Sequence, residues 1–243
     1  MMKGKLILVG AGPGDPDLIT VKGIKALAQA DVLLYDALAN KELLSHTREG
    51  CKQIFVGKRP NVHRTQQKEI NELIVKYTLE GKIVVRLKGG DPYVFGRGHE
   101  EEVYVASHGI ETEVIPGVSS FYSVPAVNHL PLTRRGLSES FWVLTGTTRD
   151  LSIAKDIKMA ARSHATVVIL MGMSKLGQIC QIFREEGNKH QLVTIIQNGT
   201  LPNQKIVSGT IETIEELVQK EKMTNPSIIV IGQVNEVLSD ASL

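Results

Sequence analysis

The sequence predicts a protein of two α/β domains. Short apolar segments alternate with amphipathic helical segments along the 243 residues, which is typical of a mostly parallel sheet with helices on both faces. The pattern pauses near Pro116 and then starts again. We therefore predict an N-terminal domain over residues 1–116 and a C-terminal domain over residues 117–243, with the junction between Pro116 and Ser120.

In the N-terminal half, each expected strand is an apolar run, and each expected helix carries apolar residues at helical spacing. The expected strands are residues 6–9, 32–35, 54–56, 83–87 and 112–115, and the expected helices are 20–28, 65–77 and 100–107. Thr20 is a favourable N-cap for the first helix, and Gly81 and Gly109 follow the other two helices.

The C-terminal half repeats this alternation less regularly. Its expected strands are residues 141–144, 166–170, 193–196, 205–207 and 227–231, and its expected helices are 175–186 and 214–220. We predict residues 205–207 as an edge strand, and a polar tail after Val237.

The segment Val84–Glu101 runs from a buried strand into a loop that contains four glycines and a proline. Glycine permits unusual backbone angles and lets a ligand approach the main chain. Ligands of open α/β sheets bind at the carboxyl ends of strands. A plain turn is the alternative, but strand-to-helix connections usually have about 2–6 residues and this loop is longer. We predict a binding loop in which Asp91 offers a carboxylate to the ligand and does not cap the following helix.

The first expected strand leads into a second glycine loop, G-A-G-P-G-D-P-D at residues 10–17. A dinucleotide-binding loop has the pattern G-x-G-x-x-G at the start of a helix that holds a pyrophosphate. Here the glycines follow G-x-G-x-G, Pro13 lacks an amide proton, and Asp15 and Asp17 would repel phosphate. No Gly-Lys-Ser/Thr follows, so a Walker loop is also excluded. The loop favours a ligand without phosphates.

Polar residues follow several expected strands and suggest catalytic groups. Asp36 ends one strand, and Lys58 and Arg59 follow the next, so they are a candidate acid–base pair; a simple capping role for Asp36 is the alternative. His63 and His129 are further possible hydrogen-bond donors. The chain shows no Ser-His-Asp set, no Cys-His signature and no H-E-x-x-H, so hydrolytic and metal-dependent chemistry lack support.

Basic residues gather in the predicted loops although the formal net charge is only +2. Guanidinium groups bind carboxylates as well as phosphates, so these cations indicate a pocket for a polyanion, with solvated surface charge as the alternative. The residues are Lys58, Arg59, Arg64, Lys88, Arg97, Arg134, Arg135 and Arg149.

Composition is that of a soluble globular protein, with 42% hydrophobic and 22% charged residues. The small net charge does not indicate nucleic-acid binding, and no apolar run approaches the ~20 residues of a membrane span. Cys51 and Cys180 match no metal or redox spacing, and the short apolar run near the start is no signal peptide. We expect a cytoplasmic protein with reduced thiols.

Several motifs run through the whole chain. The first half contains V-G-A-G-P-G-D-P, L-Y-D-A-L, V-G-K-R with His63 and Gln67, and G-G-D-P-Y-V-F-G-R-G-H-E-E. The second half contains P-G-V-S-S, L-M-G-M, Q-N-G-T and N-P-S-I-I-V-I-G. Together these motifs resemble those of the uroporphyrinogen III C-methyltransferases, in the tetrapyrrole methylase superfamily.

The resemblance implies two α/β domains with the active site in the cleft between them and a homodimeric enzyme. Such an enzyme transfers two methyl groups from S-adenosylmethionine to uroporphyrinogen III, giving precorrin-2 by way of precorrin-1 and leaving S-adenosylhomocysteine. The product serves sirohaem and cobalamin synthesis. No metal is implied, and without a fused dehydrogenase–chelatase part the chain is expected to be a stand-alone methyltransferase.

The resemblance also implies roles for individual residues. Asp36 corresponds to the proton acceptor and Lys58 to the proton donor. The residues expected to contact the cofactor are Pro13, Gly89, Gly90, Asp91, Val94, Ser119, Ser120, Met171 and Gly199. Arg59, His63, Arg97 and Arg134 are expected to bind the carboxylates of the substrate.

The chain departs from the usual pattern at His129, Arg134 and Thr147, where relatives commonly have Gly, His and His. All three are expected on the substrate side. Two alternatives follow: another methylase of the superfamily, such as a later precorrin methyltransferase, a diphthine synthase or an rRNA ribose methyltransferase, or a module that binds the cofactor without chemistry.

Overall fold

The computed structural model describes residues 4–57 and 67–236. The chain forms two compact units, Met1–Ser119 and Ser120–Leu243, which are called unit 1 and unit 2 below. Each unit is an α/β domain with its own sheet, in agreement with the predicted fold class.

The sheet of unit 1 has five strands in the order β3-β2-β4-β1-β5. The strands are β1 (Lys5–Gly10), β2 (Val32–Tyr35), β3 (Lys52–Phe55), β4 (Ile83–Lys88) and β5 (Glu111–Ile115). All neighbouring strands are parallel, which confirms the expectation for this half. The carboxyl ends of all five strands therefore lie along one edge of the sheet.

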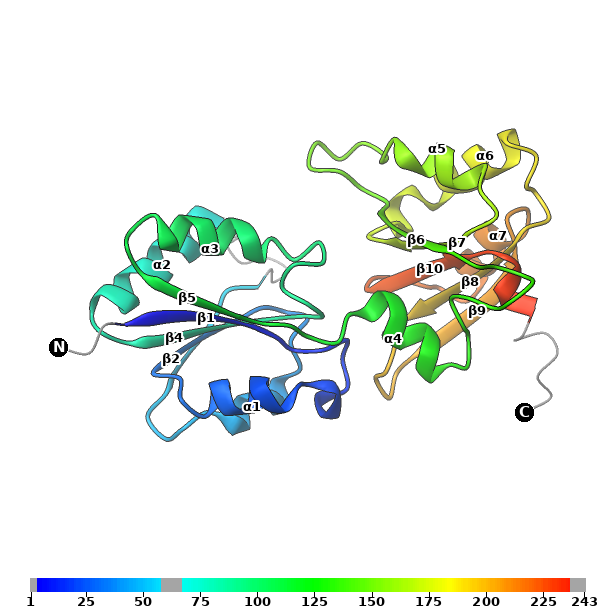
Figure 1. The fold of residues 1–243 in the computed structure, drawn as a ribbon. Helices are drawn as coiled ribbons and strands as arrows, with labels where there is room; N and C mark the ends of the chain where they lie inside the picture. The colour runs from blue at the N-terminus through cyan, green and yellow to red at the C-terminus, as the bar shows by residue number, and fades with distance from the viewer. Residues whose placement is uncertain (1–3, 58–66, 237–243) are drawn as a thin grey trace. The chain divides into compact units, whose positions relative to one another are not determined.

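Helices cover both faces of this sheet (Figure 1): α1 (Val21–Leu27) lies on one side, and α2 (Gln67–Leu79) and α3 (Gly98–Ala106) lie on the other. Because side chains alternate along a strand, Leu6, Leu8 and Val84 pack toward α2 and α3, while Ile7 and Val85 pack toward α1. A strand that is buried on both faces reads as a nearly continuous apolar run, and this is why the central strands β1, β2 and β4 were visible in the sequence.

The local boundaries of unit 1 follow ordinary capping chemistry. The hydroxyl of Thr20 accepts a hydrogen bond of 3.0 Å from the amide of Gly23, as predicted for the N-cap of α1. Gly81 and Gly109 follow α2 and α3 with φ of 80° and 70°, a conformation that glycine adopts without strain.

The sheet of unit 2 has the order β6-β7-β10-β8-β9. Its strands are β6 (Phe141–Thr145), β7 (Thr166–Leu170), β8 (Leu192–Gln197), β9 (Lys205–Thr210) and β10 (Ser227–Ile231). β6 and β7 are parallel, but β10 is antiparallel to both of its neighbours, and β9 is antiparallel to β8. The predicted edge strand is confirmed as β9.

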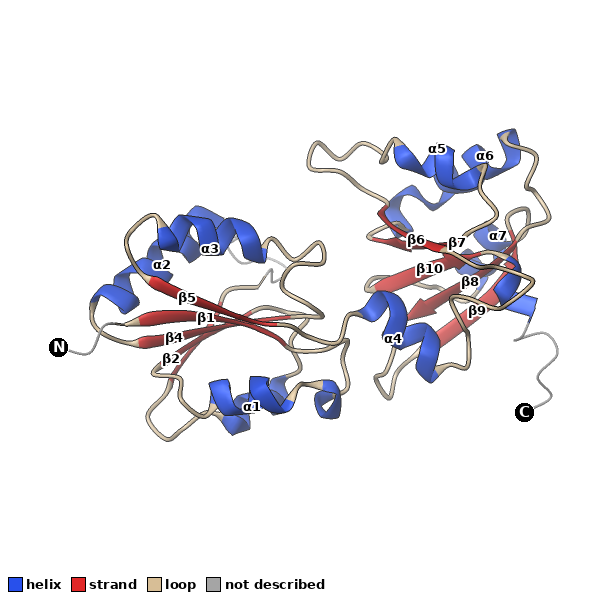
Figure 2. Cartoon of the chain, in the orientation of Figure 1, coloured by secondary structure: helices blue, strands red, loops and turns tan. Residues whose placement is uncertain are grey.

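Helices cover both faces of the second sheet as well (Figure 2). On one face, α5 (Asp156–Ala161), α6 (Leu176–Glu185) and α7 (Ile214–Lys220) share one core cluster. On the other face, α4 (Ser120–Val127) packs through Val124 against Val168 of β7 and Ile196 of β8. The sequence did not predict α4 and α5; α4 contains Pro125, and α5 is only six residues long.

Four short 3₁₀ helices complete the described structure: η1 (Pro16–Leu18), η2 (Lys41–His46), η3 (Met173–Lys175) and η4 (Gln233–Asn235). None of the described helices is long and apolar enough to span a membrane.

Candidate functional site

Several of the predicted site residues meet at the carboxyl edge of the sheet in unit 1. Pro13 follows β1, Asp36 follows β2, and Gly89 to Asp91 follow β4. The two glycine loops are joined directly, because the amide of Gly90 donates to the carbonyl of Gly12 at 2.7 Å, and the amide of Gly12 donates back at 3.3 Å. The structure therefore combines the two loops that the sequence suggested as separate ligand-binding features.

Two glycines allow the backbone segments at this edge to approach this closely. A Cβ atom on Gly117, beyond the end of β5, would lie 2.2 Å from the carbonyl oxygen of Gly90. A Cβ atom on Gly10 would lie 2.4 Å from the Cα of Gly117. Backbone thus packs on backbone at this edge, and no larger residue fits at Gly10 or Gly117 without moving a loop.

Gly90 differs from these two glycines. It has φ of 66°, and no heavy atom lies within 4 Å of the position that its Cβ would occupy. The main chain at Gly90 therefore borders open space at the carboxyl edge. A ligand that approached the main chain here would find the space that a side chain would otherwise fill.

Asp91 holds the glycine loop in shape. One oxygen of its carboxylate accepts a hydrogen bond from the amide of Gly117 at 2.9 Å, and the other accepts one from the amide of Tyr93 at 2.8 Å. Asp91 thus has a structural role that the sequence did not predict. A carboxylate has about four lone-pair sites, so two remain available to a cationic ligand.

Beside this loop lies a cluster of charged residues, called the buried ion cluster below, made of Asp36, Arg86, Lys88 and Glu101. Lys88 Nζ donates to both carboxylate oxygens of Glu101 at 3.1 Å, and Arg86 Nε donates to the same carboxylate at 3.4 Å. Glu101 is fully buried, and Arg86 and Lys88 are each 4% exposed. The prediction that Lys88 is one of the loop cations of a pocket for a polyanion is therefore wrong, since Lys88 lies in β4 and its charge is neutralised inside the protein.

Alternation along β4 explains the position of this cluster. Val84, Arg86 and Lys88 point to the face that α2 and α3 cover, where Val84 belongs to the apolar core. The buried stripe of α3 consists of Gly98, Glu101 and Val105, so Glu101 faces the sheet above the two cations. A sequence pattern could have revealed the cluster. Two charged residues occupy inward positions of β4, and an acidic residue lies on the buried stripe of the next helix, α3.

The charges of the cluster balance. Burial lowers the pKa of Lys88, as does the neighbouring charge of Arg86, while Glu101 opposes both effects. Gln67 on α2 donates a further hydrogen bond of 2.9 Å to Glu101. Two cations and two carboxylates thus meet without a formal excess of charge.

Asp36 is the member of the cluster nearest to solvent, with 25% of its side chain exposed. Its Oδ2 lies 3.4 Å from Arg86 Nη2, and its Oδ1 accepts from the amide of Leu38 at 3.1 Å. The other residues predicted near it, Lys58, Arg59, His63 and Arg64, lie outside the described residues. The acid–base pair of Asp36 with Lys58 therefore stays a prediction.

Arg97 and Val94 lie on the loop between β4 and α3. The exposed Arg97 has φ of 61° and donates to Glu100 at 2.6 Å and 3.1 Å, which raises the pKa of the guanidinium. The amide of Val94 donates to the carbonyl of Asp91 at 3.4 Å, closing a turn.

In unit 2, β6, β7 and β8 run in one direction, so their carboxyl ends share an edge. Met171 and Gly199 follow β7 and β8 at this edge. Met171 has φ of 55° and is 49% exposed, although a left-handed conformation costs energy in a residue with a side chain. Thr147, which follows β6, donates from its hydroxyl to the carbonyl of Met171 at 2.9 Å and so holds that strained residue.

The two serines predicted to contact the cofactor, Ser119 and Ser120, lie at the start of α4, and Ser119 is buried. A Cβ atom on Gly199 would lie 2.3 Å from a methyl carbon of Val124 on the same helix. Helix α4 therefore packs directly against the Gly199 loop, and this contact requires glycine at position 199.

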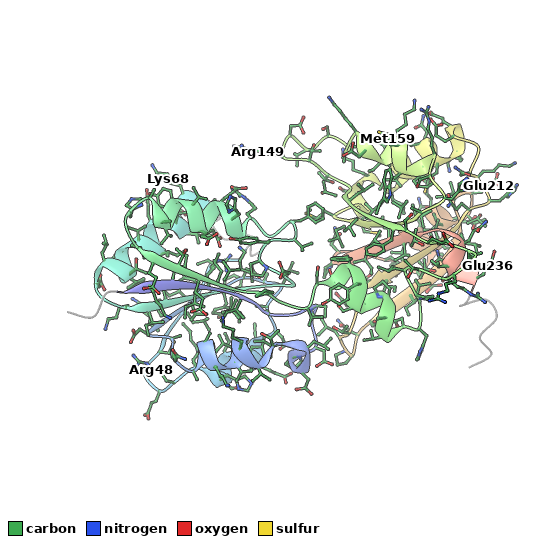
Figure 3. The ribbon with its side chains drawn as sticks, in the orientation of Figure 1. Arg48, Lys68, Arg149, Met159, Glu212 and Glu236 are labelled. Atoms are coloured by element: carbon green, nitrogen blue, oxygen red, sulfur yellow. The ribbon has the colours of Figure 1, made fainter. Side chains whose placement is uncertain are left out.

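Of the arginines predicted in unit 2, Arg134 and Arg135 do not lie at this edge, whereas Arg149 lies on the loop that follows β6. Arg134 pairs with Ser138 in a hairpin, and the hydroxyl of Ser138 lies 3.0 Å from that of Thr166 at the start of β7. Since Met171 comes five residues after Thr166, the hairpin lies roughly 16 Å from Met171 along the strand. Arg135 is also on the hairpin, and Arg149 extends from a loop after β6 (Figure 3).

His129, another predicted hydrogen-bond donor, is exposed just after α4 and has φ of 57°. Among the described residues, no group of three or more His, Cys, Asp or Glu side chains is arranged to hold a metal ion.

The binding loop is also attached to α3 through Tyr93, and this contact predicts that the stability of the protein depends on pH. The Tyr93 hydroxyl donates to the Glu102 carboxylate, and this hydrogen bond, with a smaller effect of burial, raises the pKa of Tyr93 from 10.0 to about 12. The contribution of this hydrogen bond to stability is thus complete below pH 10.0 and is lost as the pH rises through about 12. Urea titrations over this interval should show a steeper loss for the parent than for Tyr93→Phe, and parallel curves would contradict the assignment.

Comparisons with known proteins agree with the geometry. The pattern of the Tetrapyrrole (Corrin/Porphyrin) Methylases matches residues 5–215. The Uroporphyrinogen-III C-methyltransferase of Methanocaldococcus jannaschii is 45% identical over 239 residues, which are 98% of this chain and 99% of that protein.

Two solved structures are similar over nearly the whole chain. One is the Uroporphyrin-III C-methyl transferase of Thermus thermophilus in complex with S-adenyl homocysteine, with a TM-score of 0.83, 34% identity, and 96% of this chain and 100% of that chain covered. The other is a cobalt precorrin-4 methyltransferase with a TM-score of 0.84, 28% identity, and 95% of each chain covered. The predicted family is therefore confirmed, and the chain belongs to the tetrapyrrole methylases.

Proposed function

We propose that this protein is a uroporphyrinogen III C-methyltransferase that transfers methyl groups from S-adenosylmethionine to two carbons of uroporphyrinogen III. Precorrin-1 is the intermediate and precorrin-2 the product, which serves sirohaem and cobalamin synthesis. The observation that carries the proposal is the 45% identity to a protein of this name over 98% of the chain. The similar structure that holds S-adenyl homocysteine supports the choice of cofactor.

The carboxyl edge of unit 1 fits this cofactor. The open space beside Gly90 admits a ligand to the main chain, and Asp91 keeps lone pairs for the cofactor's amine. Bound there, S-adenosylmethionine supplies an activated methyl group on a sulfonium. We assign the cofactor to Pro13, Gly89, Gly90, Asp91 and Val94 of unit 1, with Ser119, and to Ser120, Met171 and Gly199 of unit 2.

The role of the protein is then mainly to orient the reacting groups and to manage protons. Methylation displaces a proton from the tetrapyrrole, and we assign Asp36, whose carboxylate is partly exposed, as its acceptor. Lys58 is assigned as the proton donor. Arg59, His63, Arg97 and Arg134 are assigned to the substrate carboxylates.

A second function, methylation of a later precorrin, is favoured by the TM-score of 0.84 to the cobalt precorrin-4 methyltransferase. Identity separates the two, since that protein is 28% identical and the uroporphyrinogen methyltransferase is 45% identical. The alternative of a module that binds the cofactor without chemistry predicts binding but no turnover.

Incubation with radiolabelled S-adenosylmethionine and either uroporphyrinogen III or a later precorrin distinguishes these functions. We expect label in the tetrapyrrole only from uroporphyrinogen III, with two methyl groups per product by mass spectrometry. Label only in the later precorrin would favour the second function. Binding of S-adenosylhomocysteine by calorimetry with no label in either substrate would leave only the binding module. Sedimentation of the same preparation tests the homodimer that we also propose.

A further inference from the structure

The buried ion cluster contains one arginine, which is neither a cofactor contact, a substrate contact nor a proton donor or acceptor in the proposed function. Arg86 lies on β4, and its side chain is 4% exposed on the face of the sheet that α2 and α3 cover. A buried arginine is costly to desolvate and needs partners for all its donors. The partners it has indicate what it does.

Those partners hold the guanidinium in one orientation. Nε donates to the fully buried Glu101 at 3.4 Å, and Nη1 donates to the carbonyl of Leu87 at 3.1 Å. Glu101 is itself held by Lys88 on both oxygens. The remaining nitrogen, Nη2, is directed at Asp36 Oδ2 at 3.4 Å, so a rigid donor faces the carboxylate that was assigned as proton acceptor.

Asp36 is fixed from two directions as a result. Leu38 donates its amide to Oδ1, and Arg86 holds Oδ2. Asp36 follows β2 on the same face as Leu34, so it enters the cluster at its exposed end. A base that must be held in line with a substrate is served by such a fixed support, because misplacement by about 1 Å can cost about 100-fold in rate.

We propose that Arg86 is a positioning residue that orients the Asp36 carboxylate for proton acceptance, with Glu101 as its anchor. This role rests on the proposed function. Lys88 shares the anchor carboxylate with Arg86, but it has no hydrogen bond to Asp36 among the described contacts. It therefore provides a matched control from the same strand, the same face and the same depth of burial.

A double-mutant cycle on the full-length protein tests the proposal. Single-turnover rates and the Kd for S-adenosylhomocysteine are measured for the parent, Arg86→Met, Asp36→Asn and the double variant. Arg86→Met leaves Glu101 paired with Lys88, so we expect it to fold. We expect its rate to fall by about 10- to 100-fold, with the Kd changed by less than about threefold. In the Asp36→Asn background, the same change should lower the rate by less than about threefold, because coupled residues are not additive.

The control variant Lys88→Met should have a lower melting temperature than the parent. Its single-turnover rate should be lower by less than about threefold, since Arg86 still supports Asp36. An equal loss of rate from Arg86→Met in both backgrounds would overturn the proposal, as would an equal loss from Lys88→Met. If Arg86→Met does not fold, Arg86→Lys takes its place in the cycle, because lysine keeps the positive charge but lacks the planar guanidinium that bonds two partners at once.

The same measurements separate this role from the proposed function. A parent chain without turnover would overturn the function, and the role of Arg86 with it. Full activity of Asp36→Asn would remove Asp36 as the proton acceptor and so overturn the role of Arg86, while methyl transfer itself would stand. If the parent turns over substrate but the rate losses of Arg86→Met and Asp36→Asn are additive in the double variant, only the role of Arg86 is overturned.

Discussion

Replacing Glu101 with alanine is expected to destabilise unit 1 by about 3–5 kcal/mol, the cost that typically follows removal of one partner from a buried ion pair. The carboxylate is fully buried and accepts hydrogen bonds from Lys88, Arg86 and Gln67. Without it, two cations with 4% exposure would face each other with no buried counter-charge. Urea titration followed by circular dichroism should show an early transition for unit 1.

The neighbouring residue supplies the control for this experiment. Glu100 pairs with Arg97 on the surface of α3, where both side chains are more than half exposed. Exposed pairs of this kind contribute about 0.2–1 kcal/mol, so Glu100→Ala should hardly move the transition. Equal effects of the two substitutions would show that the cluster contributes no more to stability than a surface pair.

Gly90→Ala is expected to weaken binding of S-adenosylhomocysteine by about tenfold to a hundredfold. The added methyl group would enter the open space beside the main chain, where we assign the cofactor. Overpacking of a close contact typically costs about 1–3 kcal/mol, which corresponds to about one to two decades in affinity. Calorimetry on the folded variant measures the change directly.

Gly109→Ala separates this effect from backbone strain. Gly109 has φ of 70° against 66° for Gly90, and neither would bring its Cβ within 4 Å of another heavy atom. Both variants should therefore lose about 1–2 kcal/mol of stability from the left-handed conformation, while only Gly90→Ala loses affinity. Unchanged affinity in Gly90→Ala would move the cofactor away from this loop.

Hydrophobic periodicity, together with the capping residues and glycines at the ends of elements, was enough to predict most of the fold. The central strands β1, β2 and β4 of unit 1 are buried on both faces, so each reads as a mainly apolar run, and Thr20, Gly81 and Gly109 mark helix ends where predicted. In unit 2 the strand positions were predicted but not the antiparallel direction of β10, because a strand has the same apolar pattern in either direction. Helix α4 carries a proline and so gave no clear helical pattern.

The candidate site also has features that the sequence predicts and features that only the tertiary structure shows. The sequence by itself determined the family, the two glycine loops and the carboxylate at the end of β2, because each of these depends on residues that are adjacent in the chain. The tertiary structure alone decided that Lys88 is buried, that Arg86 supports Asp36, and that Asp91 binds the amide of Gly117. The physical reason is that a charge is placed by its partners, and these partners come from other strands and helices, between 13 and 50 residues away along the chain.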